Sequence, residues 1–126
     1  MLNTGAGAFT VTGNGSTCTI ATPTCDGGSI QSSTGQGILF NKVGPVSLTR
    51  IKVQNSGNRS VGTPAQTAGD TCAGACINGF TMDNSIITDS AGWALDDGLV
   101  LTNVTGAVSV TNSAIADIPH NGMSAA

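Results

Sequence analysis

The sequence repeats itself at intervals too short for separate domains. Three segments share an apolar–polar–apolar triplet, a few polar residues and a second short apolar stretch: VSLTRIKVQNSG from Val46, FTMDNSIITDSAG from Phe80 and VSVTNSAIADIPHNG from Val108. A second pair, GILFNKVGPVSLT from Gly37 and GLVLTNVTGAVSVT from Gly98, matches with a slip of one residue before the triplet. Self-similarity of this kind is typical of proteins that stack one structural unit many times.

The composition predicts that the repeated unit consists of β-strands. Charged residues make up 9% of the chain, against about 25% in an average soluble protein. Eighteen residues are glycine, and Ser, Thr and Asn take the place of the long side chains that favour helices. The remaining apolar residues form short runs of good strand formers, so we predict an all-β protein.

A right-handed parallel β-helix of about four coils accounts best for the repeat. The chain would form one module over residues 1–126, with coils at approximately 1–36, 37–57, 58–92 and 93–122. Stacked coils bury apolar side chains that no single coil can bury. The inward ladders would be Ile38/Leu99, Val46/Phe80/Val108, Leu48/Met82/Val110 and Ile51/Ile86/Ala114, and the Asn residues of QNS, DNS and TNS would occupy corners. An antiparallel sandwich is the alternative fold.

Four cysteines occur as two local pairs, one in each of the two longest insertions between repeats. Four cysteines allow three connectivities, and we predict Cys18–Cys25 and Cys72–Cys76 because each bond would close a loop. A metal site made by all four is the alternative, although neither spacing is the usual one for zinc. Disulfides would indicate an oxidising compartment.

The charge balance argues against nucleic acid as a partner. The formal net charge is −3 and only four residues are basic, too few to follow a phosphate backbone. No apolar run of about 20 residues is present to insert into a membrane. The first residues do not resemble a secretion signal, so we expect Met1 to be an artificial start or the signal to lie elsewhere.

Several blocks of the sequence resemble right-handed parallel β-helix repeat proteins, which are very large secreted or surface-anchored bacterial proteins. The blocks are TGAGAFTVTGNG, GGSIQSSTGQGILF, VSLTRIKVQNSG, INGFTMDNSIITDS and DDGLVLTNVTGAVSVTNSAI, and together they cover nearly the whole chain. The resemblance implies the fold and an extracellular or cell-surface location. The wider group includes pectate lyases, polygalacturonases, adhesins and phage tailspikes, so the fold does not select a function.

The Asp96–Asp97 pair invites comparison with polygalacturonase-like hydrolases, which use clustered carboxylates, a histidine and a basic RIK tripeptide. The chain has His120 and an RIK at 50–52, but RIK precedes the histidine here, whereas it follows the histidine in the resembling enzymes. Adjacent strand residues face opposite ways, while inverting glycosidases need two carboxylates facing one cleft. We therefore interpret the pair as turn residues before Gly98 and predict that the protein is not an enzyme.

Other aspartates could form a calcium or carbohydrate site. Their carboxylates are hard oxygen ligands of the kind that calcium prefers, and the single tryptophan could present a flat face to a sugar. No calcium-loop spacing is present, so no cofactor is expected. The candidate residues of such a site are Asp83, Asp89, Trp93, Asp96 and Asp97.

Threonine-rich stretches raise one more function, the binding of ice. That activity would need a regular, flat array of threonines on successive coils. The TVT of Thr10–Thr12 does not recur as a motif later in the sequence. We therefore do not expect an array in register.

The sequence is most consistent with a non-catalytic structural or adhesive module of a secreted or cell-surface protein. The ends of a four-coil solenoid would expose unpaired strand edges. Copies of the chain could cover these edges by stacking head to tail into a filament. The alternative is a carbohydrate-active or carbohydrate-binding β-helix that uses the clustered aspartates on a polysaccharide.

Overall fold

The computed structural model describes residues 2–64, 72, 74–88 and 97–125. Within these residues the secondary structure consists of β-strands, with no helix, and hence none that could cross a membrane. The strands are β1 (Phe9–Thr12), β2 (Ser29–Gln31), β3 (Ile38–Leu39), β4 (Val46–Thr49), β5 (Lys52–Gln54), β6 (Val61–Gly62), β7 (Ile77–Asp83), β8 (Ile86–Thr88), β9 (Leu99–Leu101), β10 (Val104–Thr111), β11 (Ala114–Ala116) and β12 (Met123–Ala125).

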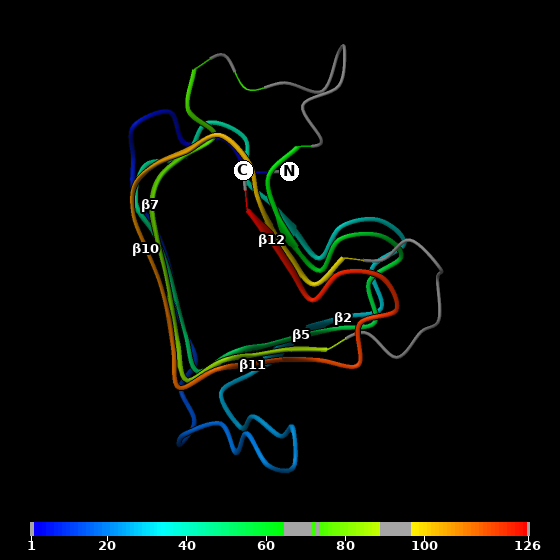
Figure 1. The fold of residues 1–126 in the computed structure, drawn as a ribbon. Coiled ribbons are helices and arrows are strands. Elements are labelled where there is room, and N and C mark those ends of the chain that lie inside the picture. Colours follow the sequence, from blue (N-terminus) through cyan, green and yellow to red (C-terminus); the bar gives the residue numbers. More distant parts are fainter. Residues whose placement is uncertain (1, 65–71, 73, 89–96, 126) are drawn as a thin grey trace.

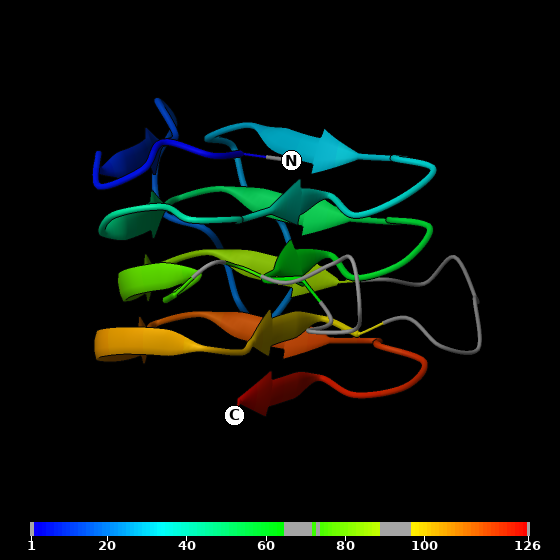
Figure 2. The same cartoon turned by 90° about the horizontal axis from the view of Figure 1, so that it is seen from above.

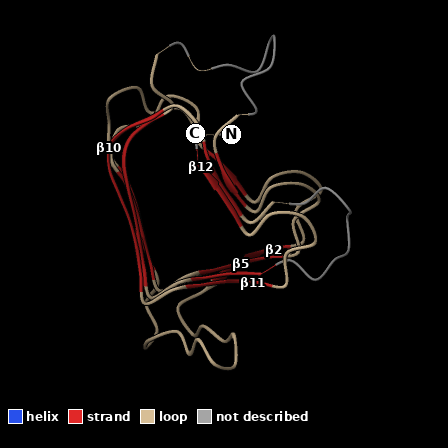
Figure 3. Ribbon diagram, in the orientation of Figure 1, coloured by secondary structure: helices blue, strands red, loops and turns tan. Residues whose placement is uncertain are grey.

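Every third strand joins the same sheet. The three sheets have the orders β1-β4-β7-β10, β2-β5-β8-β11 and β3-β6-β9-β12, and neighbouring strands within each sheet are parallel. Figure 1 shows the three sheets enclosing a common interior, and Figure 2 shows the successive layers from the side. Strands are the only regular elements drawn in Figure 3. The prediction of an all-β, parallel structure is confirmed, and the antiparallel sandwich is wrong.

The register of the first sheet agrees with the sequence alignment. Val46 pairs with Phe80 and Phe80 with Val108, and the same holds for Leu48, Met82 and Val110. In the third sheet, Ile38 and Leu99 lie on one ladder with Val61 between them. These ladders were predicted and are confirmed.

The predicted inward ladder of Ile51, Ile86 and Ala114 is wrong at its first member and in its direction, because the neighbouring residue of the strand, Ile87, is the one that joins the core. Ala114 pairs with Ile86, but the partner of Ile86 in the next layer is Lys52. Ile51 lies one position earlier, in the corner, where its backbone N–H donates to Ser85 Oγ over 3.3 Å. Its side chain is nevertheless buried, because it packs into the core from the corner.

The one-residue slip in the sequence corresponds to a β-bulge in β10. The pairing of β10 with β7 shifts register between Thr105 and Val108. Gly106 lies in this shift with a φ of 77°, and Gly79 in the opposite strand has a φ of 92°. Both values lie in the region that glycine adopts without steric cost.

The core lies between the three sheets and contains the inward side chain of nearly every strand in the middle layers. Phe9, Phe40 and Phe80 form an edge-to-face column through three layers, with ring centroids 5.7 Å and 6.5 Å apart. The largest fully buried side chains are Phe40, Phe80, Leu48, Ile77, Met82, Ile86, Ile87, Leu99, Leu101, Val46, Val53 and Val61. Burying them requires neighbouring layers on both sides.

Asparagines occupy corners, as predicted, but not all at the same corner. Asn84 and Asn112 follow the first sheet, with φ values of 45° and 46°. Asn55 follows the second sheet, with a φ of 51°. Asparagine tolerates this left-handed conformation better than most residues. The Asn of QNS therefore lies at a different corner from the Asn residues of DNS and TNS, and the three do not form one ladder.

Both predicted disulfides are present, Cys18–Cys25 and Cys72–Cys76. The first closes a loop on the flank of the stack. There the backbone N–H of Cys18 donates to Asn84 Oδ1 over 2.7 Å, and Asn84 Nδ2 donates to the Cys18 carbonyl over 3.3 Å. The loop is thus attached to a residue 66 positions further along the chain. The two bonds indicate an oxidising environment.

Candidate functional site

The structure separates the predicted site residues that it describes. Asp83 is the last residue of β7, at the corner between the first and second sheets. Asp97 lies two residues before β9, which belongs to the third sheet. β8 (Ile86–Thr88) of the second sheet comes between them in the chain, and each carboxylate has its own set of partners. Asp89, Trp93 and Asp96 fall outside the described residues.

Asp97 forms the densest polar cluster at its corner. His120 Nδ1 lies 2.8 Å from Asp97 Oδ1, and Asn121 Nδ2 donates to the same oxygen over 3.0 Å. Arg59 Nε lies 3.9 Å from Asp97 Oδ2. The Asp97 side chain is only 17% exposed, so these contacts are partly shielded from water and from salt.

The contacts of Asp97 connect three successive layers. Backbone hydrogen bonds place Arg59, Asp97 and Asn121 in consecutive layers at this corner, since Ser60 N donates to Asp97 O and Gly98 N to Asn121 O. The glycine that follows Asp97 permits the layers to approach closely, because a Cβ at Gly98 would lie 2.5 Å from the Gly122 carbonyl oxygen. The carboxylate therefore acts as a bridge between layers.

Burial raises the pKa of Asp97, but hydrogen bonds from His120 and Asn121 lower it, and together with the histidine charge they hold it below its ordinary value of 3.8. Hydrogen bonding to the charged form is the expected cause of such a decrease. The carboxylate is thus ionised at any physiological pH. A general acid needs a raised pKa, which Asp97 does not have.

Acid should destabilise this corner. Because the pKa of Asp97 is lower in the folded than in the unfolded protein, its stabilising effect is present above about pH 3.8 and is lost as the pH falls through the folded pKa. We expect the thermal midpoint of the wild type to fall on acidification below about pH 4, and Asp97→Asn to show a lower midpoint at neutral pH with a flatter acid limb. Circular dichroism melts would measure both.

Asp26→Asn is the matched control, since Asp26 is exposed directly after the disulfide loop, where it accepts a hydrogen bond from Ser16 Oγ over 3.2 Å. Its midpoint should follow the wild type across the same pH range. An Asp97→Asn curve that coincides with the wild type at every pH would show that the contacts of Asp97 contribute nothing to stability.

Asp83 occupies a second polar corner. Thr111 Oγ1 donates to Asp83 Oδ1 over 2.7 Å, and Asn112 Nδ2 donates to the same oxygen over 3.0 Å. These hydrogen bonds, that of Thr111 first, hold the pKa of Asp83 below its ordinary value. Asp83 therefore also connects neighbouring layers, β7 to β10.

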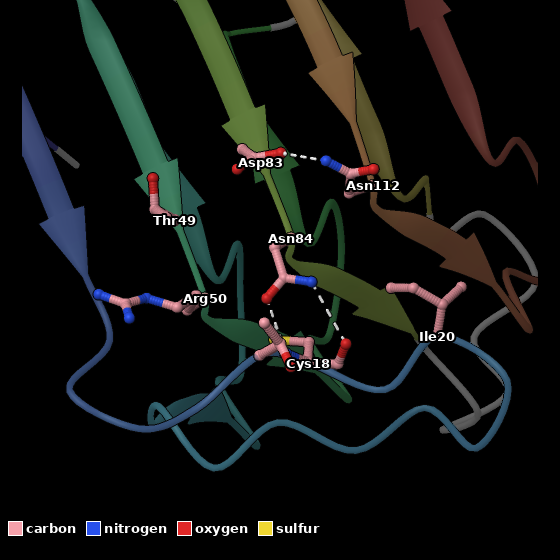
Figure 4. A pocket seen from close by; sticks show the side chains of 8 residues that line it. Cys18, Ile20, Thr49, Arg50, Asp83, Asn84 and Asn112 are labelled. Carbon is pink, nitrogen blue, oxygen red and sulfur yellow. Dashed lines mark hydrogen bonds between the residues drawn. The ribbon is translucent and has the colours of Figure 1, made fainter.

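A hollow of about 600 Å³ lies between this corner and the disulfide loop. Thr17 and Cys18 of the loop form one side, and Arg50, Asp83 and Asn112 of the corner form the other. Figure 4 shows the Asn84 amide turned toward Cys18, where both of its polar atoms hold the loop, and Asp83 turned toward Asn112. Asn84 and Asp83 are therefore engaged in holding the structure together.

The basic RIK tripeptide does not join His120. Arg50 lies at the corner of Asp83, where its Nη1 donates to the Gly15 carbonyl over 3.4 Å. His120 pairs with Asp97 at the other corner. Among the described residues, no group of three or more His, Cys, Asp or Glu side chains is placed to hold a metal ion.

The ends of the stack expose apolar side chains that the middle layers bury. In the first layer Ile30 is 37% exposed, and in the last layer Val108 is 46% and Met123 54% exposed. Beside Ile30, a hollow of about 210 Å³ is lined by Leu2, Phe9 and Ile38 among others. These ends form the second candidate site, an interaction surface.

Two features of these sites were not predicted from the sequence. Arg59 and Asn121 were not recognised as partners of Asp97, although both are close to it in the stacked register. Their positions relative to the following strands, two residues before Val61 and two before Met123, match that of Asp97 before Leu99. This shared offset is the signal that could have identified them.

Compared with known protein families, curated proteins and solved structures, the chain has no match. Its function must therefore be argued from the arrangement of its own residues.

Proposed function

We propose that the chain is a right-handed parallel β-solenoid of about four coils that serves as a non-catalytic structural or adhesive module. Its first and last layers are the functional surfaces, and each binds the opposite end of another copy. The module belongs to a secreted or cell-surface protein. One observation carries the proposal, namely that the apolar positions of the two end layers lie on the same ladders.

The ladders of the first sheet illustrate this match. Within the chain, Phe9 and Val108 end one ladder, and Val11 and Val110 end the next. A second copy placed in the same register would set Phe9 against Val108 and Val11 against Val110. The partly exposed apolar groups of one end would thus be covered by those of the other.

The other two sheets match in the same way. Ile30 and Ile115 end a ladder of the second sheet that passes through Val53 and Ile87. Ile38 and Met123 end a ladder of the third sheet. In the stacked register Met123 would lie over Ile38, next to the hollow at the first layer. Ala125 would then take the place beside Phe40 that Leu2 holds within one chain, so stacking requires the residues around Leu2 to move aside. All three sheets therefore present apolar groups to apolar groups.

The backbone provides a second reason for end-to-end association. β1 and β2 form one edge of the first and second sheets, and β10, β11 and β12 form the opposite edges of the three sheets. Beside β3, Leu2 bridges Phe40 and its N–H donates to the Leu39 carbonyl over 2.7 Å, so the end of β3 is already partly paired. The outer side of an edge strand carries unpaired N–H and C=O groups, which pair readily with a further strand. Because the two ends differ, the contact is heterologous and adds copies along one axis without closing.

The disulfides and the low charge support the proposed location. Two local disulfides persist only where thiols are oxidised, as outside the cell. The separation of Asp83 from Asp97, by contrast, gives no support to a shared carboxylate cleft. A structural role accounts for both carboxylates, because each connects neighbouring layers.

Electron microscopy of the purified protein tests the proposal. We expect unbranched filaments, one solenoid wide, whose length increases with protein concentration. Size-exclusion chromatography of the same samples should show a matching rise in apparent mass. A protein that remains monomeric at high concentration, with its β circular dichroism intact, would contradict end-to-end association.

A further inference from the structure

The outward face of the first sheet carries a regular array of hydroxyl groups. Its outward positions form two columns that cross all four layers in register. One column reads Thr10, Ser47, Thr81 and Ser109, and the other reads Thr12, Thr49, Asp83 and Thr111. The expectation that Thr10 and Thr12 are not repeated in register is therefore wrong, since Thr81 lies on the ladder of Thr10 and Thr49 and Thr111 lie on that of Thr12. Serine in alternate layers of the first column and Asp83 in the second obscure the motif in the sequence.

The array is open to solvent. Thr10, Thr81 and Ser109 of the first column are exposed, as are Thr12 and Thr111 of the second, and the others are half-buried. In Figure 1 the disulfide loop leaves at the lower corner and does not cross the outer side of β7 and β10. Among the residues that the structure describes, none lies over the centre of this face in that view.

The side chains beside the array are small, so they do not project above the hydroxyl groups. A third outward column lies two residues before the first hydroxyl column. It contains Ala8 and Pro45, which precede β1 and β4, and Ala107 of β10. These small residues project little beyond the backbone. Asp83 is the only charged side chain among the eight positions of the two hydroxyl columns, and Thr111 and Asn112 hold it in place.

Among the described residues, the other two sheets carry no comparable array. One outward column of the second sheet contains Ser29, Lys52, the buried Ile86 and Ala114, which share no chemical type. The outward column of the third sheet contains Gly62 and the buried Val100. The hydroxyl array is thus a property of one face and does not follow from the general abundance of threonine.

The spacing of the array is set by β-structure. Neighbouring parallel strands lie about 4.8 Å apart, and alternate residues along a strand lie about 6.6 Å apart. The shorter of these distances is close to an oxygen repeat of hexagonal ice, and the longer is somewhat below the next one. A rigid rectangular array of hydroxyls can therefore hold water molecules at positions that continue an ice lattice, each bridged by hydrogen bonds to the protein.

We propose that this face binds ice. The threonine methyl groups would lie against the ice surface, and the hydroxyl groups would anchor ordered water in register with the lattice. A face that is flat, nearly uncharged and regular suits such a crystalline ligand. It suits a single soluble sugar less well, because a sugar requires a concave site that surrounds it. The proposal does not depend on head-to-tail association, since four layers already present the array.

Partition into slowly growing ice tests the proposal. The wild-type protein should be enriched in the ice fraction, shape single ice crystals and slow their recrystallisation. Thr81→Tyr places a ring above the plane at the centre of the array and should lose all three effects. Ser109→Tyr makes the same change in the last layer and should reduce them.

The matched control is Gln31→Tyr, an exposed outward position on the second sheet, which should behave as the wild type. Circular dichroism and the thermal midpoint must show that each variant is folded. Exclusion of the folded wild type from ice would overturn the proposal, as would equal activity of Thr81→Tyr. Retention on crystalline cellulose together with exclusion from ice would overturn it in favour of a polysaccharide ligand.

Discussion

Replacing Phe40 by alanine should destabilise the protein by about 3–5 kcal/mol, the usual cost of removing a fully buried phenylalanine. The Phe40 side chain has no exposed surface. Its ring contacts Phe9 on one side and Phe80 on the other. Alanine would leave a cavity in the middle of this column, and chemical unfolding followed by circular dichroism would measure the loss.

The loss in free energy of unfolding should exceed the hydrophobic free energy of burying one side chain, because Phe40 joins neighbouring layers. In a stacked repeat each layer is stabilised mainly by its contacts with the next. Removing the central ring weakens two layer contacts at once, so we expect the transition of Phe40→Ala to broaden as well as to shift. Marginal stability of about 5–15 kcal/mol in natural domains makes such a change easy to detect.

Ile20→Ala is the control for this experiment. Ile20 is 38% exposed and lies on the disulfide loop, outside the core. Its replacement also removes apolar groups but should change stability by well under half as much as Phe40→Ala. Equal losses from the two variants would show that the phenylalanine column does not hold the layers together.

Much of the fold could be predicted because stacking makes the sequence repeat. The match of Val46 with Phe80 and Val108 follows from the alternation of inward and outward residues, which a strand imposes on any sequence. The slip between Val104 and Val108 was also visible, and the structure identifies it as a bulge. Local disulfides could be predicted as well, because each needs only a short loop.

The errors arose where the chain turns. The alignment placed Ile51 on a ladder that Lys52 occupies, because a corner interrupts the alternation and allows a shift of one residue. The hydroxyl array was missed for a different reason, since Ser47 and Ser109 replace threonine in alternate layers of one column and Asp83 interrupts the other. Residues on the column of Ser47 and Ser109 all carry a hydroxyl group, although the residue itself changes between threonine and serine.

The contacts of the candidate sites could be predicted from the sequence only through the shared offset of Arg59, Asp97 and Asn121 before their strands. Asp97 lies 23 residues from His120 and 38 residues from Arg59, a separation given by the residue numbers of the ion pair. They meet because consecutive layers superimpose the same corner. The position of every residue at a corner depends on the lengths of the insertions elsewhere, which the repeat pattern does not fix.

Head-to-tail stacking in the register of the chain's own ladders is tested most directly by cysteine cross-linking. Ser29 and Ala114 begin the first and last strands of the second sheet and lie on one ladder. Within one molecule, β5 and β8 separate them. Between stacked copies they would be neighbours about 4.8 Å apart, within the Cα range that a disulfide spans.

The double variant Ser29→Cys/Ala114→Cys should therefore form a ladder of covalent multimers on mild oxidation, seen on non-reducing gels and abolished by reductant. In the control, Ser29→Cys/Ala116→Cys, the second cysteine is displaced by two residues, or about 6.6 Å, and should yield little product. A ladder from the in-register pair alone is the predicted result. Monomers from both variants, or equal ladders from both, would contradict the account.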